Sequence, residues 1–133
     1  MTATRSSILL VDDEIIVLKS AKRLLEKKGY AVLTAEDGAG AMEILRDRHT
    51  EIGVILLDLS MPGMDGADVF KALRRDETLK ALKVCIVTGR PEMRHLIYER
   101  PYRRPEGYLN KPFTEDLLVQ SLSQILGFSK ERP

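Results

Sequence analysis

Short apolar runs alternate along this chain with longer stretches of helical periodicity, and this alternation restricts the fold more than any other feature. The runs have the length of strands, and three of them are almost continuously Val, Ile or Leu, as parallel strands covered on both faces are. The expected strands are Ile8–Val11, Ala31–Thr34, Val54–Leu57, Val84–Thr88 and Gly107–Leu109. Successive strand–helix units predict an α/β fold, an open parallel sheet with right-handed crossovers and helices on both faces.

The helical stretches carry their own start and stop signals. Gly29 follows the first helix as a C-terminal stop, Thr114 is placed to cap the last helix, and Gly127 is placed to end it. The expected helices are Glu14–Lys28, Gly40–Arg48, Ala67–Arg75 and a last helix between Thr114 and Gly127. Their apolar residues recur at i, i+3 and i+4, so each helix is expected to bury one stripe against the sheet.

The segment 90–106 departs from this rhythm because it contains three prolines. Pro91 suits the first turn of a helix, whereas Pro101 disfavours helical geometry at the residue before it. We therefore expect a short helix that ends by about Glu99, followed by a mobile connector, Arg100–Glu106. The buried stripe of this short helix would be Met93, Leu96 and Ile97. The segment is rich in arginine, which is either a solvated surface or a basic docking site for an acidic partner.

Composition narrows the class of protein. The 133 residues suit one domain, expected to span residues 1–133 with a core at about 8–127, and 44% hydrophobic with 31% charged residues allow a buried core. Lys and Arg number 21 against 20 acids, so net charge gives no argument for nucleic acid. No stretch approaches the roughly 20 apolar residues of a membrane span, and no signal-peptide core is present. The single Cys85 is expected to be a core thiol, and the protein to be cytoplasmic.

Open parallel sheets bind ligands beyond the carboxyl ends of their strands, and the chemically distinctive residues of this chain fall there. Asp12 and Asp13 follow the first strand, and Asp58 ends the third. Thr88 ends the fourth strand, and Lys111 follows the fifth. Taken singly, each has an ordinary structural role, such as a helix cap, a strand residue or a solvated lysine. Together, at one edge of one sheet, they predict a functional site.

Phosphoryl transfer is the chemistry that this set of side chains suits. Three clustered carboxylates repel one another unless a cation lies among them, and Mg²⁺ prefers carboxylate and phosphate oxygens. Such an ion would bridge the carboxylate of Asp58 and an incoming phosphoryl group. Lys111 and Thr88 would supply a positive charge and a hydroxyl donor to the remaining phosphoryl oxygens. Attack by a carboxylate gives an acyl phosphate, which is reactive enough to serve as a transient mark.

Four motifs in this chain resemble those of the receiver domains of response regulators. They are ILLVDDE at 8–14, VILLDLSMPGMDG at 54–66, IVTG at 86–89 and YLNKPF at 108–113. The likeness runs from about Ile8 to Gly127, with the motifs in the family's order and spacing. It implies a flavodoxin-like, five-stranded doubly wound sheet with strand order 2-1-3-4-5. It also implies a cis Lys111–Pro112 peptide bond.

The resemblance further implies a signalling phosphoacceptor of a two-component phosphorelay. Such a domain assists its own phosphotransfer and autodephosphorylation and is not an enzyme in the ordinary sense. Asp58 would receive the phosphoryl group from a phosphohistidine on a sensor histidine kinase or a histidine phosphotransfer protein. The implied ligands of Mg²⁺ (or Mn²⁺) are Asp13, Asp58 and the main-chain carbonyl of Ser60, with Asp12 acting through water.

Lys111 would then be the cation that binds the phosphoryl group, with Thr88 as the switch hydroxyl and Tyr108 as the switch aromatic residue. The face formed by the fourth helix, the fifth strand and the last helix would change on phosphorylation and act on an unknown output protein or domain. We expect neither a membrane partner nor direct binding of nucleic acid. Ser60 and Arg90 occupy the two positions that vary within the family and tune the lifetime of the phosphoryl group.

Three other readings compete with this one. A pseudo-receiver, which binds partners without phosphorylation, usually lacks an acid, the acceptor or the lysine, and all are present here. An aspartyl-phosphate phosphatase commonly carries a second Asp two residues after its nucleophile, where this chain has Ser60. A flavin or nucleotide binder needs a glycine-rich phosphate cradle after the first strand, where this chain is acidic.

Overall fold

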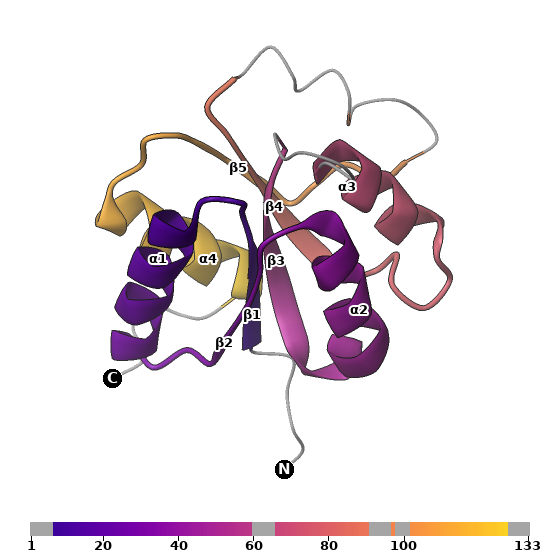
Figure 1. Cartoon of the computed structure of the whole chain (residues 1–133), viewed down its shortest axis with the longest axis horizontal. Coiled ribbons are helices and arrows are strands. Elements are labelled where there is room, and N and C mark those ends of the chain that lie inside the picture. The colour runs from indigo at the N-terminus through magenta and orange to yellow at the C-terminus, as the bar shows by residue number, and fades with distance from the viewer. Residues whose placement is uncertain (1–6, 60–65, 91–96, 98–101, 128–133) are drawn as a thin grey trace.

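The protein is a five-stranded parallel sheet with helices on both faces (Figure 1), seen in a computed structural model that describes residues 7–59, 66–90, 97 and 102–127. The strands are β1 (Ser7–Val11), β2 (Val32–Ala35), β3 (Ile52–Asp58), β4 (Lys83–Thr88) and β5 (Gly107–Asn110). Their order in the sheet is β2-β1-β3-β4-β5, and every neighbouring pair is parallel. The expected fold class and strand order are therefore confirmed.

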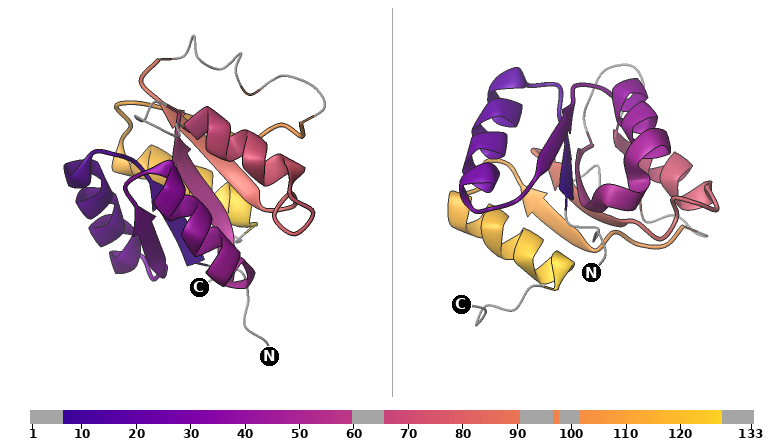
Figure 2. Two further views of the ribbon diagram at one scale, coloured as in Figure 1. Left: turned by 45° about the vertical axis from the view of Figure 1, so that its right-hand side comes forward. Right: turned by 90° about the horizontal axis from the view of Figure 1, so that it is seen from below.

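In the described part of the chain, two helices lie on each face of this sheet (Figure 2). The helices are α1 (Ile15–Lys27), α2 (Gly38–Arg48), α3 (Gly66–Arg75) and α4 (Glu115–Leu126), with a 3₁₀ turn η1 (His49–Glu51) after α2. α1 and α4 lie on one face, and α2 and α3 on the other. The short helix expected after Pro91 lies outside the described residues except for Ile97, which is buried as expected. No helix in the described part of the chain is long and apolar enough to cross a membrane.

Local signals set the ends of the helices. The Thr114 side chain accepts a hydrogen bond from the Leu117 amide at 3.1 Å, and Gly127 ends α4 with a left-handed φ of 77°. Both features were expected. At α2 the cap is Asp37, whose carboxylate accepts a 2.7 Å hydrogen bond from the Gly40 amide. This cap starts the helix at Gly38, two residues before the expected start at Gly40.

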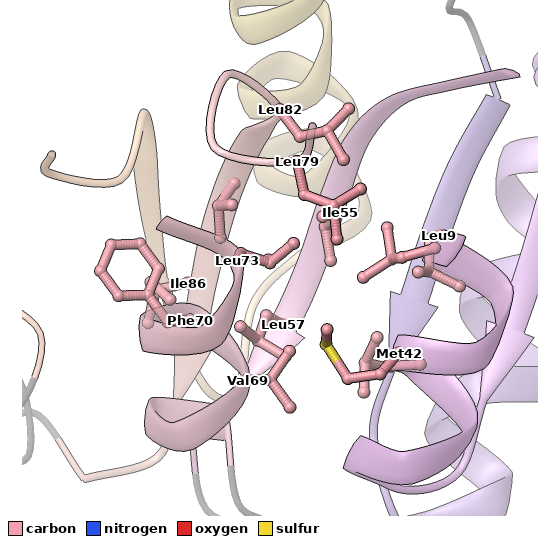
Figure 3. Close-up of a cluster of buried hydrophobic side chains, with 14 of the residues drawn as sticks. Leu9, Met42, Ile55, Leu57, Val69, Phe70, Leu73, Leu79, Leu82 and Ile86 are labelled. Carbon is pink, nitrogen blue, oxygen red and sulfur yellow. The ribbon is translucent and has the colours of Figure 1, made fainter. Parts of the chain in front are cut away.

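The core consists of two apolar layers, one on each face of the sheet. β3 is buried over its whole length, and its side chains alternate between the layers. Ile55 and Leu57 pack beneath α2 and α3 (Figure 3), whereas Val54 and Leu56 pack beneath α1 and α4. Each such side chain contributes about 1.5–3 kcal/mol through burial. Cys85 belongs to the second layer, where burial raises its thiol pKa to about 12, so it is a core residue as expected.

A buried arginine ties the connector before β5 to the rest of the fold. The Arg74 side chain is only 1% exposed and leaves the last turn of α3. Its guanidinium donates to the carbonyls of two separate chain segments and to one carboxylate. The acceptors are the main-chain oxygens of Lys80, Leu82, Arg103 and Arg104 and Oε1 of Glu106, at 2.7–3.1 Å. We call this arrangement the Arg74 anchor.

The described part of the connector, residues 102–106, makes several further polar contacts with the rest of the fold. The Glu106 amide donates to the Val84 carbonyl at 2.8 Å, and the Glu106 carboxylate accepts from the Val84 amide at 2.7 Å. Arg103 donates to the Leu82 carbonyl and pairs with Glu106. In residues 102–106, polar contacts with α3 and β4 thus replace the regular structure that proline prevents, and the expected mobility of the connector stays a prediction.

Candidate functional site

Three carboxylates meet at the carboxyl end of the sheet. Asp12 follows β1, and Asp58 is the last residue of the neighbouring β3, with Val11 and Leu57 in register just before them. Oxygen atoms of Asp12, Asp13 and Asp58 all lie within 4.8 Å of one another. Asp12 and Asp58 are buried, whereas Asp13 is exposed. The buried strand thus carries a carboxylate into a position where it is costly unless it is paired.

Lys111 is the cation that compensates these charges. Its ammonium donates to Oδ2 of Asp12 at 2.9 Å, to Oε1 of Glu14 at 2.9 Å and to Oδ2 of Asp58 at 3.2 Å. Partial burial opposes the charged form of the lysine, but the hydrogen bonds with Asp12 and Glu14 and the charges of Asp58 and Asp12 outweigh it. Together they raise the pKa of Lys111 above its usual value. The ammonium is therefore fully charged at neutral pH.

The backbone on either side of Lys111 places its side chain at the strand ends. The Lys111 amide donates to the Thr88 carbonyl at 2.8 Å, which continues the pairing of β4 with β5. The peptide bond that follows, Lys111–Pro112, is cis, as the resemblance implied. Asp12 is also held from its own loop, because its Oδ1 accepts a 2.9 Å hydrogen bond from the Glu14 amide.

The two expected switch residues lie in neighbouring strands of the sheet. Thr88 is buried at the end of β4, and its hydroxyl donates to the Arg90 carbonyl at 3.1 Å and accepts from the Arg90 amide at 2.8 Å. Tyr108 is half-buried in β5, where it packs against the apolar layer under α2 and α3. Ile86 of β4 is its partner in register. Ser60, the expected source of a main-chain carbonyl ligand, lies outside the described residues.

Gly66 fixes how closely α3 approaches the end of β3. Its amide donates to the Leu59 carbonyl at 3.2 Å. A Cβ at this position would lie 1.9 Å from the Asp58 carbonyl oxygen and 2.6 Å from the Leu59 Cα, both far inside contact distance. Only glycine therefore allows α3 to start against the main chain of Asp58, and any larger residue would displace the strand end that carries the carboxylate.

The carboxylate cluster fits a hard divalent cation. All three side chains offer oxygen ligands, which Mg²⁺ and Mn²⁺ prefer. Ligands about 2.0–2.6 Å from a shared ion lie within roughly 5 Å of one another, a limit that the observed 4.8 Å respects. Lys111 alone cannot neutralise three aspartates and Glu14, so the cluster keeps a net negative charge that a metal ion would balance.

An apolar groove opens beside this cluster. Its walls come from α1, from α4 and from the turn between β5 and α4. They include Ile16, Val17, Leu24, Phe113 and Leu118, together with Lys111 itself. Ile16 is 79% exposed, an unusual position for a large aliphatic side chain next to other apolar groups. The groove therefore leads from an exposed apolar patch to the cation that contacts Asp58.

Sequence reasoning missed Glu14 and Gly66 as members of this site. Glu14 follows the two aspartates directly, but a contact between its flexible side chain and Lys111 depends on a rotamer that no pattern predicts. Gly66 stands eight positions after Asp58 at a helix start, and that spacing was the available signal for a close approach of the backbone.

Comparison with known proteins agrees with this geometry. The family model described as response regulator receiver domain matches residues 8–123. The chemotaxis protein CheY of Pseudomonas aeruginosa is 35% identical over 119 residues, covering 89% of this chain and 94% of that protein. Protein PilH of the same organism is 30% identical, covering 90% and 96%. A response regulator receiver domain from Clostridium thermocellum superposes with a TM-score of 0.81 at 28% identity, covering 92% of this chain and 94% of that one. The chain belongs to the receiver-domain family of two-component response regulators.

Proposed function

We propose that this protein accepts a phosphoryl group on Asp58 from a phosphohistidine and passes the signal on by a change of its surface. The observation that supports the proposal best is the contact between the buried Asp58 carboxylate and Lys111, 3.2 Å apart, within a cluster of three aspartates at a strand end. Residues 1–133 would act as one receiver domain. A pseudo-receiver or a flavin binder does not need this set of charges, and a phosphatase would commonly carry a second Asp where this chain has Ser60.

In the proposed reaction, an Asp58 carboxylate oxygen attacks the phosphorus atom. The phosphorus–nitrogen bond of the phosphohistidine breaks, its electron pair returns to the imidazole, and that ring takes up a proton. Lys111 is placed to donate hydrogen bonds to the transferred group once it sits on Asp58. Asp13, Asp58 and Asp12 would hold a Mg²⁺ or Mn²⁺ ion that neutralises charge on the phosphoryl oxygens.

The switch would begin at Thr88. Phosphorylation brings about −1.5 to −2 charges and three acceptor oxygens to the strand ends. The Thr88 hydroxyl would exchange its hydrogen bonds within the Arg90 turn for a phosphoryl oxygen, and Tyr108 would move into the space that Thr88 leaves. The resulting change in β5 and its surroundings would reach an output protein or domain.

The phosphohistidine donor would dock in the apolar groove between α1 and α4. The groove ends at Lys111, so a partner seated there places its imidazole next to Asp58. α1 is also strongly basic on its exposed side, through Lys19, Arg23 and Lys27, which favours a donor with acidic residues around an apolar contact.

Donor docking and phosphoryl chemistry can be separated by experiment. Ile16→Glu should slow transfer from a phosphorylated histidine kinase or phosphotransfer protein by about tenfold or more, as expected when a charge enters an apolar contact. The same variant should react normally with acetyl phosphate, which needs no docking surface. An equal loss with both donors would show that Ile16 acts on the chemistry or on the fold, and would refute the docking assignment.

The competing pseudo-receiver function predicts no covalent change at all. The protein is incubated with acetyl phosphate and Mg²⁺, and its intact mass is measured with and without EDTA. We expect an increment of one phosphoryl group that EDTA prevents. An unchanged mass in Mg²⁺, with a folded protein, would favour the pseudo-receiver over the phosphoacceptor.

A further inference from the structure

Lys111 is fully engaged before any phosphoryl group arrives. An ammonium group has three N–H donors, and three carboxylates surround this one at hydrogen-bonding distance. They belong to Asp12, Glu14 and Asp58, at 2.9, 2.9 and 3.2 Å. A phosphoryl oxygen on Asp58 can receive a hydrogen bond from Lys111 only when one of these contacts gives way or lengthens.

Glu14 differs from the other two carboxylates in two respects. Oxygens of Asp12 and Asp58 belong to the cluster that fits a divalent ion, and Glu14 is not a member of that cluster. Its side chain is also 60% exposed, against 7% for Asp12 and 4% for Asp58, so it can leave for solvent at little cost. When a metal ion neutralises the aspartates, Glu14 keeps its full attraction for Lys111.

Among the described residues, the Glu14 side chain makes no hydrogen bond or ion pair apart from its contact with Lys111. Glu14 is the N-cap residue of α1, but its side chain makes no capping hydrogen bond. The Glu14 amide donates a hydrogen bond to Asp12, and this bond holds the main chain of Glu14 next to the site. The position of Glu14 is therefore set by the site, while its carboxylate is free to contact Lys111.

We propose that Glu14 is a positioning residue that holds Lys111 in the unphosphorylated state and competes with the phosphoryl group for it. This inference rests on the proposed phosphoacceptor function of Asp58. Glu14 thereby weakens the affinity of the site for a phosphoryl group, both by occupying the ammonium and by adding a negative charge near an incoming anion. The activated state is reached when Lys111 leaves Glu14 for the phosphoryl oxygens and the Glu14 side chain turns to solvent.

The test uses beryllofluoride, a non-covalent mimic of the phosphoryl group, in the presence of Mg²⁺. Its Kd is measured by calorimetry for the full chain, for Glu14→Gln and for Glu14→Asp. Glu14→Gln keeps the shape and removes the charge, and it should tighten binding by about two- to fivefold, the range of an exposed ion pair. Glu14→Asp keeps the charge but withdraws the carboxylate by one methylene group, so it should also tighten binding, by a smaller factor than Glu14→Gln.

The two substitutions separate a direct contact from a general effect of charge. A Glu14→Asp protein that binds beryllofluoride like wild type would overturn the contact with Lys111. Glu115→Gln is the matched control, because it removes an acid at another exposed helix start, outside the three carboxylates that contact Lys111. Equal tightening by Glu115→Gln, or no tightening by Glu14→Gln, would also overturn the proposal.

A second readout needs neither metal nor phosphoryl mimic. In EDTA, urea unfolding of wild type, Glu14→Gln, Lys111→Met and the double variant forms a thermodynamic cycle. The proposal requires a favourable coupling between the two side chains, and strict additivity would contradict it. If wild type binds no beryllofluoride and accepts no phosphoryl group, the proposed function fails. If wild type does both and Glu14→Gln changes neither readout, only the role of Glu14 fails.

Discussion

Arg74 and Lys111 are both largely buried cations surrounded by oxygen atoms, but they lie at opposite ends of the strands. Arg74 stabilises the fold, whereas Lys111 belongs to the candidate site. Arg74 lies near the start of β4 and donates mainly to neutral main-chain carbonyls, with one carboxylate, Glu106. Lys111 lies at the carboxyl end and contacts three carboxylates. Burial lowers the pKa of Arg74, whereas the pKa of Lys111 is raised by its anionic neighbours despite burial.

This difference means that the contacts that stabilise the fold around Arg74 are separate from those of the candidate site around Lys111. The acceptors around Arg74 are paired by Arg74 itself and, at Leu82 and Glu106, also by Arg103 and the Val84 amide, so this arrangement needs no further ligand. The acids around Lys111 outnumber it, so the site can still gain from a metal ion, and in the proposed function Lys111 exchanges one partner for a phosphoryl group. The Arg74 anchor also holds the chain just before β5, the strand that carries Tyr108. A structural change at the carboxyl end of β5 would therefore act on a strand whose start is fixed.

Removing the Arg74 anchor should give the largest change in stability. Arg74→Met removes one donor from the Glu106 carboxylate and from four main-chain carbonyls in buried or partly buried contacts, so the free energy of unfolding should fall by about 3 kcal/mol. Arg75→Met is the matched control: its guanidinium is exposed and contacts the Tyr102 hydroxyl and ring, so its loss should stay under about 1 kcal/mol. Urea unfolding measures both, and comparable losses would show that the Arg74 contacts do not carry the connector.

Metal binding should depend on the aspartate cluster and on no other acids of the described chain. Asp13→Ala removes an exposed carboxylate of the cluster and should weaken Mg²⁺ binding by about tenfold or more. Asp116→Ala, at an exposed position in the first turn of α4, should leave the Kd unchanged. Calorimetry measures the Kd for Mg²⁺ of both variants, and an equal loss of affinity in the two would refute the metal site.

Lys111 should matter less for folding than Arg74 does. With Mg²⁺ present, Lys111→Met should change the free energy of unfolding by no more than about 1 kcal/mol, because the metal ion neutralises the carboxylates that the lysine leaves. In EDTA the loss should be larger, whereas the loss caused by Arg74→Met should not depend on Mg²⁺. A phosphorylated Lys111→Met protein should not show the wild-type change in the amide spectrum of β5. A wild-type response would count against its role in the switch.

The sheet could be predicted because burial on both faces leaves an unbroken apolar pattern, most clearly in β3, where every residue is buried. The site could be predicted because strand ends of a parallel sheet meet at one edge, which brings Asp12, Asp58 and Lys111 together without knowledge of side-chain contacts. The positions of the strands follow from hydrophobic periodicity, whereas their order in the sheet was implied by the resemblance to receiver domains.

The Arg74 anchor was not predicted because its acceptors are main-chain atoms from segments far along the chain. One signal was available: Arg74 stands four positions after Phe70 and next to Leu73, on the buried stripe of α3. A charged residue at such a position needs partners, and it packs over the Phe70 ring at 4.9 Å. The prolines of the connector correctly predicted that residues 102–106 form no helix or strand. They gave no information about the hydrogen bonds between Arg74 and this segment.

The central claim is that Asp58 is the only acceptor, and a comparison of wild type with Asp58→Asn tests it most directly. Both proteins are treated with acetyl phosphate or a phosphorylated histidine kinase in Mg²⁺, and intact mass is followed with time. Asparagine keeps the size of the side chain but removes the nucleophilic carboxylate. We predict one added phosphoryl group on wild type and none on Asp58→Asn. Uptake by Asp58→Asn at the wild-type rate would contradict the account.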